Sequence, residues 1–518
     1  MSIRNVLSYI LLWTLTGVVN AQTDDLPRVS PESQGVSSSD IKTYFDNMLS
    51  CPTGEPHGIM ILRHGKVIGE LFPKPFDAAY PQMLYSVAKS FVGIAVGLAI
   101  EENRLRLTDR VVTFFPDLLP DTVSSHLATM TVRDLLTMTS GIRPDPQIRT
   151  TGAEWLQRYL AKPGEKPGEV FHYDSMCSYL LSAIVQQVTG EKLLDYLKRR
   201  IFIPMHISDV EWEESPEGIN TGGWGIRMQV ESMAKIGQLL MNKGNWNGQQ
   251  LIPSDWVEVM TSALQETGMT DMYGYHMWRC DYPDAYRADG AFGQYIIVAP
   301  NEDMVLAITQ ANTSNGVAER QLVWDLLRKV REAPLSESDD YTNLQKAQST
   351  YMLPVTTGRR SSKCLTKLAN KSITLEENGL DWKTLQFKPH KDTLQIIITT
   401  VTNEQYTIIA GHNSWFSTQT DVYPPYSIRA VGRYHGIHAP FYVAGCYGGT
   451  RTTLDLKVRY TNWASAADLH FELTKGRLTL QLKEKNKRNI AYYHTIDTIL
   501  HDENAHTLKK MTEDCDKK

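Results

Sequence analysis

Strand-like segments on both sides of a long helical stretch limit the fold of this chain more than any other feature. Residues 57–63 and 66–72 are short apolar runs joined at His64-Gly65, which is typical of a β-hairpin. Residues 86–272 carry mainly helical patterns, and strand character returns at 273–279, 285–288, 294–299 and 304–309. This order predicts an α+β fold in which helices flank an antiparallel sheet and an all-helical lobe lies beside it.

A β-rich pattern begins beyond residue 350. Residues 393–401 and 405–410 predict a hairpin, and apolar residues alternate strictly along 454–460. The stretch before this region is polar and acidic, as linkers are. We therefore predict four parts: a signal peptide (1–21), a sheet-and-helix domain (22–335), a linker (336–350) and a separate β-rich C-terminal domain (351–518), built as a sandwich or a barrel.

The first residues predict a secretory signal peptide. Arg4 supplies a positive charge, and residues 6–19 form an apolar core that is short for a membrane span. Val19-Asn20-Ala21 offers small residues for cleavage after Ala21. The predicted location is therefore the periplasm or the cell exterior. An uncleaved anchor is the alternative, although no stable membrane anchor is expected.

Charge and cysteine spacing exclude several kinds of partner. A formal net charge of -5 and a pI of about 6.3 argue against nucleic acid. The six cysteines lie too far apart for a zinc site or a disulfide scaffold, although an oxidising compartment permits disulfides. The chain has neither an H-E-x-x-H motif nor a Gly-rich phosphate loop after a strand, so no metal and no other cofactor is expected.

The chemistry is predicted from Ser86-Val87-Ala88-Lys89, which opens the apolar run 91–100. In a helix, residues three apart share a face, so the Lys89 amine can reach the Ser86 hydroxyl. A lysine in partly apolar surroundings loses its charge more easily and can take the proton of a serine nucleophile. This is the S-x-x-K arrangement of serine acyl-transfer enzymes.

Two other serine–lysine pairs have the same spacing, Ser39 with Lys42 and Ser232 with Lys235. The first pair fits the start and the surface of a helix over 39–49. The second lies in a predicted helix near 230–242, and no hairpin precedes it. Position after a hairpin and at the head of an apolar helix therefore favours Ser86 as the nucleophile.

Several further blocks follow Ser86 in a fixed order: 135–141, 167–173, 222–225, 233–240 and 293–300. Together with the hairpin before Ser86, they make the region from Pro31 to Ala333 resemble the class C β-lactamase superfamily of serine hydrolases. This superfamily includes D-alanyl-D-alanine carboxypeptidases, family VIII carboxylesterases and 6-aminohexanoate-dimer hydrolases. The resemblance implies hydrolysis through an acyl-enzyme, in a cleft between the lobe and the sheet.

The second motif of the superfamily, Y-x-N, has its best match at Tyr173-Asp174-Ser175. The resemblance implies that Tyr173 helps Lys89 to take the Ser86 proton and returns a proton to the leaving group. Ser175 stands in place of the asparagine and is shorter, so specificity for β-lactams or peptidoglycan is not implied. Literal Y-x-N triplets at 341–343 and 460–462 lie in the predicted linker and the C-terminal domain.

The third motif, K-T-G or H-x-G, has its nearest equivalent at Ala288-Asp289-Gly290. No lysine or histidine occupies the first position, and that cation normally pairs with a substrate carboxylate. Its absence argues for neutral esters or amides. In this register, the resemblance implies an oxyanion hole formed by the backbone N–H groups of Ser86 and Ala291, beside Gly290.

The favoured prediction is a serine esterase or amidase that acts on a small substrate. The first alternative is a D-alanyl-D-alanine carboxypeptidase or a β-lactamase, acting on peptidoglycan or β-lactams. The second is a non-catalytic ligand-binding or sensor protein with the same fold. The C-terminal domain has four aromatic residues that could contact a glycan or the cell wall but fit a sheet core as well: Trp415, Phe416, Tyr460 and Trp463.

Overall fold

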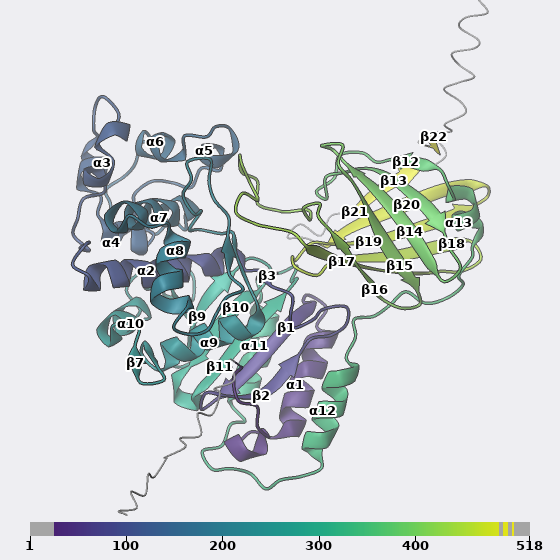
Figure 1. Cartoon of the computed structure of the whole chain (residues 1–518), viewed down its shortest axis with the longest axis horizontal. Coiled ribbons are helices and arrows are strands. Elements are labelled where there is room, and N and C mark those ends of the chain that lie inside the picture. Colours follow the sequence, from purple (N-terminus) through teal and green to yellow (C-terminus); the bar gives the residue numbers. More distant parts are fainter. Residues whose placement is uncertain (1–24, 486–490, 496–499, 502–518) are drawn as a thin grey trace, which may run out of the picture.

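The computed structural model describes residues 25–485, 491–495 and 500–501, so the predicted signal peptide lies outside the described residues. The first domain combines an antiparallel sheet with helices, and the second is a strongly curved sheet beside it (Figure 1). This arrangement confirms the predicted α+β domain followed by a β-rich C-terminal domain.

The sheet of the first domain is antiparallel and takes its strands from both ends of that domain. Its order is β2-β1-β11-β10-β9-β8, so the N-terminal hairpin pairs directly with the last strand. The strands are β1 (Pro56–Arg63), β2 (Lys66–Leu71), β8 (Trp278–Arg279), β9 (Tyr286–Gly290), β10 (Gln294–Ala299) and β11 (Met304–Gln310). The predicted hairpin is confirmed.

The prediction of a strand over 273–279 is wrong for most of that range. Only Trp278 and Arg279 form a strand, β8. Tyr273 and Tyr275 are buried instead, and Tyr275 stacks on Trp256 with ring centroids 5.4 Å apart. Aromatic residues suit both a strand and a packed loop, which explains the error.

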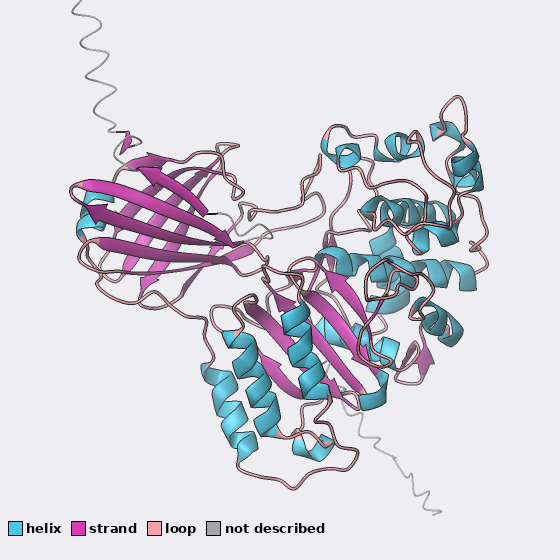
Figure 2. Cartoon of the chain, turned by 180° about the vertical axis from the view of Figure 1, so that it is seen from behind, coloured by secondary structure: helices cyan, strands magenta, loops and turns pink. Residues whose placement is uncertain are grey.

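Alternate residues of the central strands face two helical layers. On one face, Ile61 and Leu306 pack with α1 (Ser38–Ser50) and α11 (Val317–Leu327), the helices that lie over the sheet in Figure 2. On the other face, Ile296 and Val305 meet α9 (Val230–Met241) at Gly237. A Cβ atom at Gly237 would lie 2.4 Å from the Val305 side chain, so only glycine permits this approach.

The predicted linker contains a helix, α12 (Asp340–Thr350), that packs on α1. Leu344 is its buried residue, and the Tyr351 hydroxyl beyond it donates a hydrogen bond to Asp46 at 2.7 Å. One apolar contact in a polar sequence gives no amphipathic pattern. The segment therefore belongs to the first domain rather than joining it loosely to the second.

The helical lobe is inserted between β2 and β8 and is centred on α2 (Ala88–Glu101), which is buried along almost its whole length. The other helices of this insertion are α3 (Ser125–Thr129), α4 (Val132–Leu136), α5 (Gln147–Thr150), α6 (Trp155–Leu160), α7 (Ser175–Thr189), α8 (Leu193–Leu197), α9 and α10 (Ser254–Met260). Its short strands are β3 (Gln82–Met83), β4 (Glu211–Trp212), β5 (Ile226–Met228), β6 (Asn245–Trp246) and β7 (Gln249–Gln250).

Local signals account for several of these helix ends. The Thr131 side chain caps α4 and forms a capping box with Asp134. Gly190 ends α7 in the left-handed conformation, with φ of 76°. Gly97 lets the Trp256 indole lie against α2, since a Cβ atom there would be 2.1 Å from Trp256 Nε1. The Trp256 indole, from α10, also donates a hydrogen bond to the carbonyl of Gly93 in α2 at 3.0 Å, so α10 packs directly on α2.

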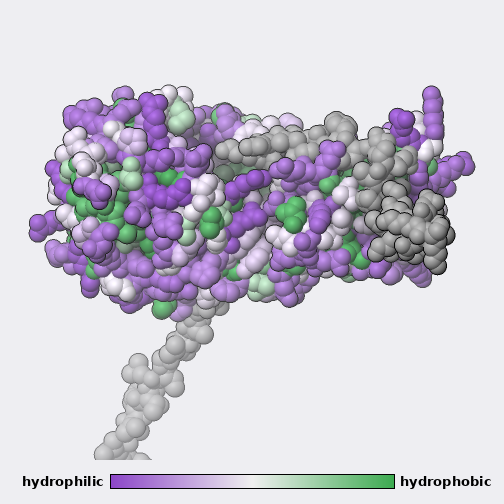
Figure 3. Space-filling model, turned by 90° about the horizontal axis from the view of Figure 1, so that it is seen from above, coloured by the Kyte–Doolittle hydropathy of each residue, from purple (hydrophilic) through white to green (hydrophobic). Residues whose placement is uncertain are grey.

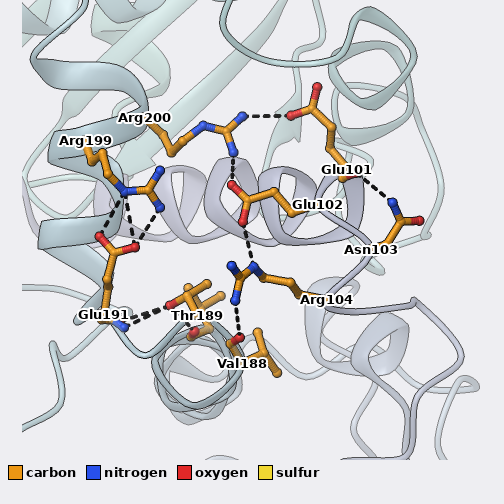
Figure 4. Close-up of polar contacts among 10 residues, drawn as sticks. Glu101, Glu102, Asn103, Arg104, Val188, Thr189, Glu191, Arg199 and Arg200 are labelled. Carbon is orange, nitrogen blue, oxygen red and sulfur yellow. Dashed lines mark hydrogen bonds and ion pairs between the residues drawn. The ribbon is translucent and has the colours of Figure 1, made fainter.

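Ion pairs fix the C-terminal end of α2 to the helices beside it (Figure 4). Arg200, in the π-helical turn Lys198–Phe202 after α8, binds both Glu101 and Glu102. Arg104 pairs with Glu102 at 2.9 Å and donates to the carbonyl of Val188 at 3.1 Å. The helix that follows the predicted nucleophile and carries Lys89 is therefore anchored at its far end.

The C-terminal domain is a half-barrel whose described strands follow the order β21-β20-β19-β18-β17-β15-β14-β13-β12-β22, with β16 paired to β17. They are β12 (Ser372–Thr374), β13 (Trp382–Pro389), β14 (Thr393–Thr400), β15 (Gln405–His412), β16 (Phe416–Thr420), β17 (Phe441–Gly448), β18 (Thr453–Tyr460), β19 (Ala466–Thr474), β20 (Arg477–Lys485), β21 (Ala491–Thr495) and β22 (Leu500–His501). Helix α13 (Lys363–Leu368) packs against β13, β18 and β19.

The four aromatic residues of this domain divide between core and surface. Tyr460 and Trp463 are buried, Trp415 is half-buried, and Phe416 is exposed. Asn462 donates a hydrogen bond to the carbonyl of Pro81 at 2.9 Å, in the first domain. The literal Y-x-N triplet at 460–462 therefore serves the sheet core and the contact between the domains.

A buried ion triad joins the two domains. Arg459 on β18 makes a bidentate pair with Glu55, at 2.6 and 3.0 Å, and binds Asp468 at 2.8 Å. Only 2% of the Arg459 side chain is exposed. Buried charges need such partners, so this contact fixes the relative position of the domains.

A long loop of the half-barrel also contacts the first domain. Residues 421–440 connect β16 to β17, and Figure 1 shows this yellow-green loop reaching towards α5. Tyr434 N–H donates to Glu213 at 3.1 Å, and Glu214 N–H donates to the carbonyl of His435 at 2.8 Å. Arg227 donates to the carbonyl of His438 at 3.0 Å. We call residues 421–440 the β16–β17 loop.

Seen from above, the surface is mainly hydrophilic, and apolar residues form small separate patches (Figure 3). Among the described residues, we find no helix with the length and apolar character that a membrane span requires. Five cysteines lie in the described part of the chain, and all five have free thiols: Cys51, Cys177, Cys280, Cys364 and Cys446.

Candidate active site

Ser86 lies where the chain enters α2, in a 3-10 turn formed by Tyr85–Val87. Tyr85 has φ of 51°, which is unusual for a bulky residue and marks local backbone strain. The Tyr85 ring is buried, so packing holds this strained turn in place. The turn therefore fixes the position of the Ser86 side chain at the start of the helix.

Lys89 is the most highly connected polar side chain of the site. Its Nζ lies 2.9 Å from Ser86 Oγ, 3.1 Å from Ser175 Oγ and 2.7 Å from the carbonyl oxygen of Gly223. The carbonyl can only accept a hydrogen bond. A neutral amine can donate to Gly223 and Ser175 and still turn its lone pair towards the Ser86 hydroxyl, which is the geometry of a base.

Burial lets the Lys89 amine lose its proton near neutral pH. It lowers the pKa of Lys89 to about 7, while the Asp174 carboxylate acts in the opposite direction. The Arg149 guanidinium lowers this pKa further. Only 1% of Lys89 is exposed, so water does little to stabilise its ammonium form. A substantial fraction of Lys89 is therefore uncharged at neutral pH.

Asp174 and Ser175 come from the start of α7. The Asp174 side chain caps this helix by accepting a hydrogen bond from Met176 N–H at 3.0 Å, and this cap turns Ser175 towards Lys89. Burial raises the pKa of Asp174 to about 6. The second Asp174 oxygen, Oδ2, is buried without a hydrogen-bond partner among the described residues.

Tyr173 lies beside both Ser86 and Lys89. Lys89 Nζ is 4.8 Å from the centroid of the Tyr173 ring. Burial raises the pKa of Tyr173 far above its usual value, although a hydrogen bond with Ser86 acts in the opposite direction. Tyr173 is therefore a neutral phenol at physiological pH and can donate a proton more readily than it can accept one.

Strand β9 forms the opposite wall of the site. A Cβ atom at Gly290 would lie 2.3 Å from the carbonyl oxygen of Leu84, so glycine lets β9 run directly beside the Ser86 turn. Ala291 follows in the turn to β10 and packs against the core. Arg287 at the start of the same strand binds Asp289 and Asp271, each at 2.8 Å.

The structure thus brings Ser86, Lys89, Tyr173 and Ser175 together and places Gly290 and Ala291 beside their turn. The other serine–lysine pairs lie elsewhere: Lys42 pairs with Asp46 on α1, and Ser232 on α9 donates to Asp209 at 2.6 Å. The triplet 341–343 lies in α12. Of the three S-x-x-K pairs, Ser86 with Lys89 is therefore the pair that contacts a residue of the second motif.

Sequence reasoning missed three contributors. Gly223 was part of a matched block but had no assigned role, and its carbonyl binds Lys89. Asp174 was read only as the middle of a motif, although its position before a helix is a capping signal. Arg149 has no local signal, because its proximity to the site depends on contacts far apart in the sequence.

The described part of the chain holds a buried histidine near Lys89 but no cluster of metal-binding side chains. No group of three or more His, Cys, Asp or Glu side chains there is arranged to hold a metal ion. His276 is buried near Lys89, but its two ring nitrogens are used by Ser178 Oγ, at 2.8 Å, and the Leu136 carbonyl, at 3.0 Å. Burial lowers the pKa of His276 to about 3, so it is neutral.

Comparison with known protein families finds a match over most of the first domain. The Beta-lactamase family model matches residues 57–331. Over 231 residues the chain is 23% identical to 6-aminohexanoate-dimer hydrolase of Paenarthrobacter ureafaciens, a match that covers 41% of this chain and 58% of that protein. It is 28% identical over 173 residues to Protein flp of Staphylococcus aureus (strain COL), covering 30% of this chain and 34% of that protein.

Among solved structures, the chain is similar to the octameric penicillin-binding protein homologue from Pyrococcus abyssi. The identity is 16% and the TM-score 0.46, with 86% of this chain and 98% of that chain covered. The curated matches span less than two thirds of the length of either relative.

Proposed function

Because this chain belongs to the beta-lactamase family, we propose that it is a serine hydrolase that cleaves an ester or amide bond of a small substrate through an acyl-enzyme. The observation that supports this most strongly is the position of Lys89. Its amine lies 2.9 Å from Ser86 Oγ, and burial lowers its pKa to about 7. A nucleophile in contact with a base of this pKa is the arrangement that acyl transfer needs.

Acylation begins when Ser86 Oγ attacks the carbonyl carbon of the substrate and its proton passes to Lys89 Nζ. The carbonyl oxygen gains negative charge, and we propose that the backbone N–H groups of Ser86 and Ala291 stabilise it. The tetrahedral intermediate then collapses and expels the leaving alcohol or amine. That leaving group takes a proton from Tyr173, which is a neutral phenol at physiological pH. Lys89 then passes the proton that it took from Ser86 to Tyr173.

Deacylation repeats these steps with water. A water molecule attacks the acyl carbonyl and gives its proton to Lys89, and the released Ser86 oxygen takes a proton back. Ser175 and Gly223 hold the Lys89 amine in place through both steps. The carboxylic acid product leaves, and the free enzyme is restored.

We also propose that the enzyme is exported to the periplasm or the cell exterior, and the N-terminal sequence supports this. Arg4, the apolar run 6–19 and the cleavage pattern ending at Ala21 carry this proposal. The partner we propose is the small-molecule substrate itself. No cofactor has a role in the steps above.

One experiment separates this function from its alternatives. The purified protein is incubated with a fluorescent phosphonate probe, with labelled penicillin, and with 4-nitrophenyl acetate and butyrate. We expect phosphonate labelling and ester turnover that disappear in Ser86→Ala. Penicillin labelling without ester turnover would favour the carboxypeptidase or β-lactamase alternative. No Ser86-dependent labelling by any reagent would favour the non-catalytic alternative and refute the proposal.

A further inference from the structure

Arg149 places a second positive charge beside the catalytic lysine. Its guanidinium lies over the Trp224 ring, with Cζ 5.4 Å from the ring centroid. Trp224 directly follows Gly223, whose carbonyl binds Lys89. The charge of Arg149 lowers the pKa of both Lys89 and Asp174, so the three groups share one electrostatic environment.

This guanidinium has no counter-ion within the part of the chain that the structure describes. Its Nε donates a hydrogen bond to the carbonyl oxygen of Arg429, at 3.2 Å. Asp174 is the carboxylate that influences it, but the two do not pair. A half-buried cation without a partner is unfavourable, because burial removes water without supplying an anion.

The β16–β17 loop supplies a second donor. Tyr426 is 3% exposed, and its hydroxyl has no hydrogen-bond partner among the described residues. The charge of Arg149 acts on Tyr426, and the Tyr426 ring lies 5.8 Å from the ring of Tyr85, the residue before Ser86. A guanidinium without a counter-ion and a hydroxyl without a hydrogen-bond partner, both near the turn that carries the nucleophile, leave room for an anionic acceptor.

The β16–β17 loop of the C-terminal domain builds this place. Val431 N–H donates to the carbonyl of Arg149 at 2.8 Å, so the loop binds Arg149 through its backbone as well as through Arg429. Tyr426 belongs to the same loop. The second domain therefore supplies both the Tyr426 hydroxyl and the backbone contacts that hold Arg149.

We propose that Arg149 and Tyr426 form a subsite for a carboxylate group of the substrate, so that the enzyme prefers esters or amides whose acyl part ends in a negative charge. This proposal rests on the proposed function and defines its substrate class. An arginine presents several N–H donors that match a carboxylate, and the adjacent hydroxyl adds another. The lack of a cation at position 288 predicts a neutral substrate, whereas Arg149 in α5 of the helical lobe supplies a cation.

The test uses three 4-nitrophenyl esters of one chain length: the adipate monoester (anionic), its methyl ester (neutral) and the 6-aminohexanoate ester (cationic). All three release the same phenol, so kcat/KM is measured by one absorbance assay on the full-length protein. For the wild type, we expect the anionic ester to be favoured over the neutral one by about tenfold or more. The ratio does not depend on how much of a preparation is active.

In Arg149→Gln we expect the ratio of anionic to neutral ester to fall to near one, and in Arg149→Glu we expect the cationic ester to be favoured. Arg149→Lys should retain part of the preference. Arg143→Gln is the matched control, because Arg143 is an exposed arginine of the same lobe that pairs with Glu165; its ratio should equal that of the wild type.

A wild-type ratio near one, or an unchanged ratio in Arg149→Gln, would overturn the subsite while Ser86-dependent turnover still upheld the proposed function. If instead none of the esters is hydrolysed in a Ser86-dependent way, the proposed function fails and the subsite fails with it. The two failures are thus read from different variants.

Discussion

Replacing Arg459 with methionine should weaken the contact between the domains. Methionine keeps much of the length of arginine but none of its charge. The variant loses a bidentate pair with Glu55 and a contact with Asp468. Removing one partner of a buried ion pair costs about 3–5 kcal/mol. The side chains of Glu55 and Asp468 are 12% and 27% exposed, so some water reaches them and the lower end of this range applies.

For a domain of the size of the C-terminal domain, a loss of about 3 kcal/mol in the free energy of unfolding lowers Tm by roughly 6–12 °C. Differential scanning calorimetry of the full-length chain measures this, and the transition of the C-terminal domain should move. Arg360→Met is the control, because Arg360 pairs with Asp392 on the surface, where the side chains are 51% and 71% exposed. Such exposed pairs contribute about 0–1 kcal/mol.

The reasoning is refuted if Arg459→Met lowers Tm by no more than Arg360→Met does. A further variant, Arg459→Met with Glu55→Gln, should recover part of the loss, because it no longer leaves the Glu55 charge without its partner. If the second substitution instead adds a full, independent loss, the two residues are not coupled as the structure indicates.

Three further outcomes are expected. The rate of phosphonate labelling of Ser86 should rise with pH through about 7 and level off above it, because the Lys89 amine accepts a proton only when uncharged; a flat profile from pH 5 to 9 would contradict this. Tyr173→Phe should lower kcat for 4-nitrophenyl acetate by about 10²–10⁴ without changing Tm, because it removes a proton donor; unaltered kcat would exclude Tyr173 from the chemistry. Gly97→Ala should destabilise the protein by about 1–3 kcal/mol, because its Cβ atom would meet the Trp256 indole; thermal denaturation that matches the wild type would show that the lobe adjusts.

Local signals explain which elements the sequence predicts well. Strands β1 and β2 are short apolar runs joined at His64-Gly65, and Gly190 ends α7 as expected for a helix stop. Ser86, Lys89, Tyr173 and Ser175 come together as the family resemblance implies. In each case the information lies within a few residues or within a recognised motif.

What the sequence does not predict depends on distant contacts. Helix α12 buries one apolar residue, Leu344, so its stability comes from α1 rather than from its own pattern. The strand predicted over 273–279 is largely a buried aromatic loop. Arg149 reaches the site only because residues 429 and 431, more than two hundred positions later, hold it there.

The β16–β17 loop also has a consequence for how such an enzyme can change. Thr420 and Phe441 lie opposite each other at the end of a paired hairpin, so the loop leaves and re-enters the half-barrel at one point. Insertions and substitutions between these two positions need not alter the strand register. The loop's share of the proposed subsite, Tyr426 and the backbone groups that bind Arg149, can therefore change within one continuous segment while Ser86 and Lys89 stay the same.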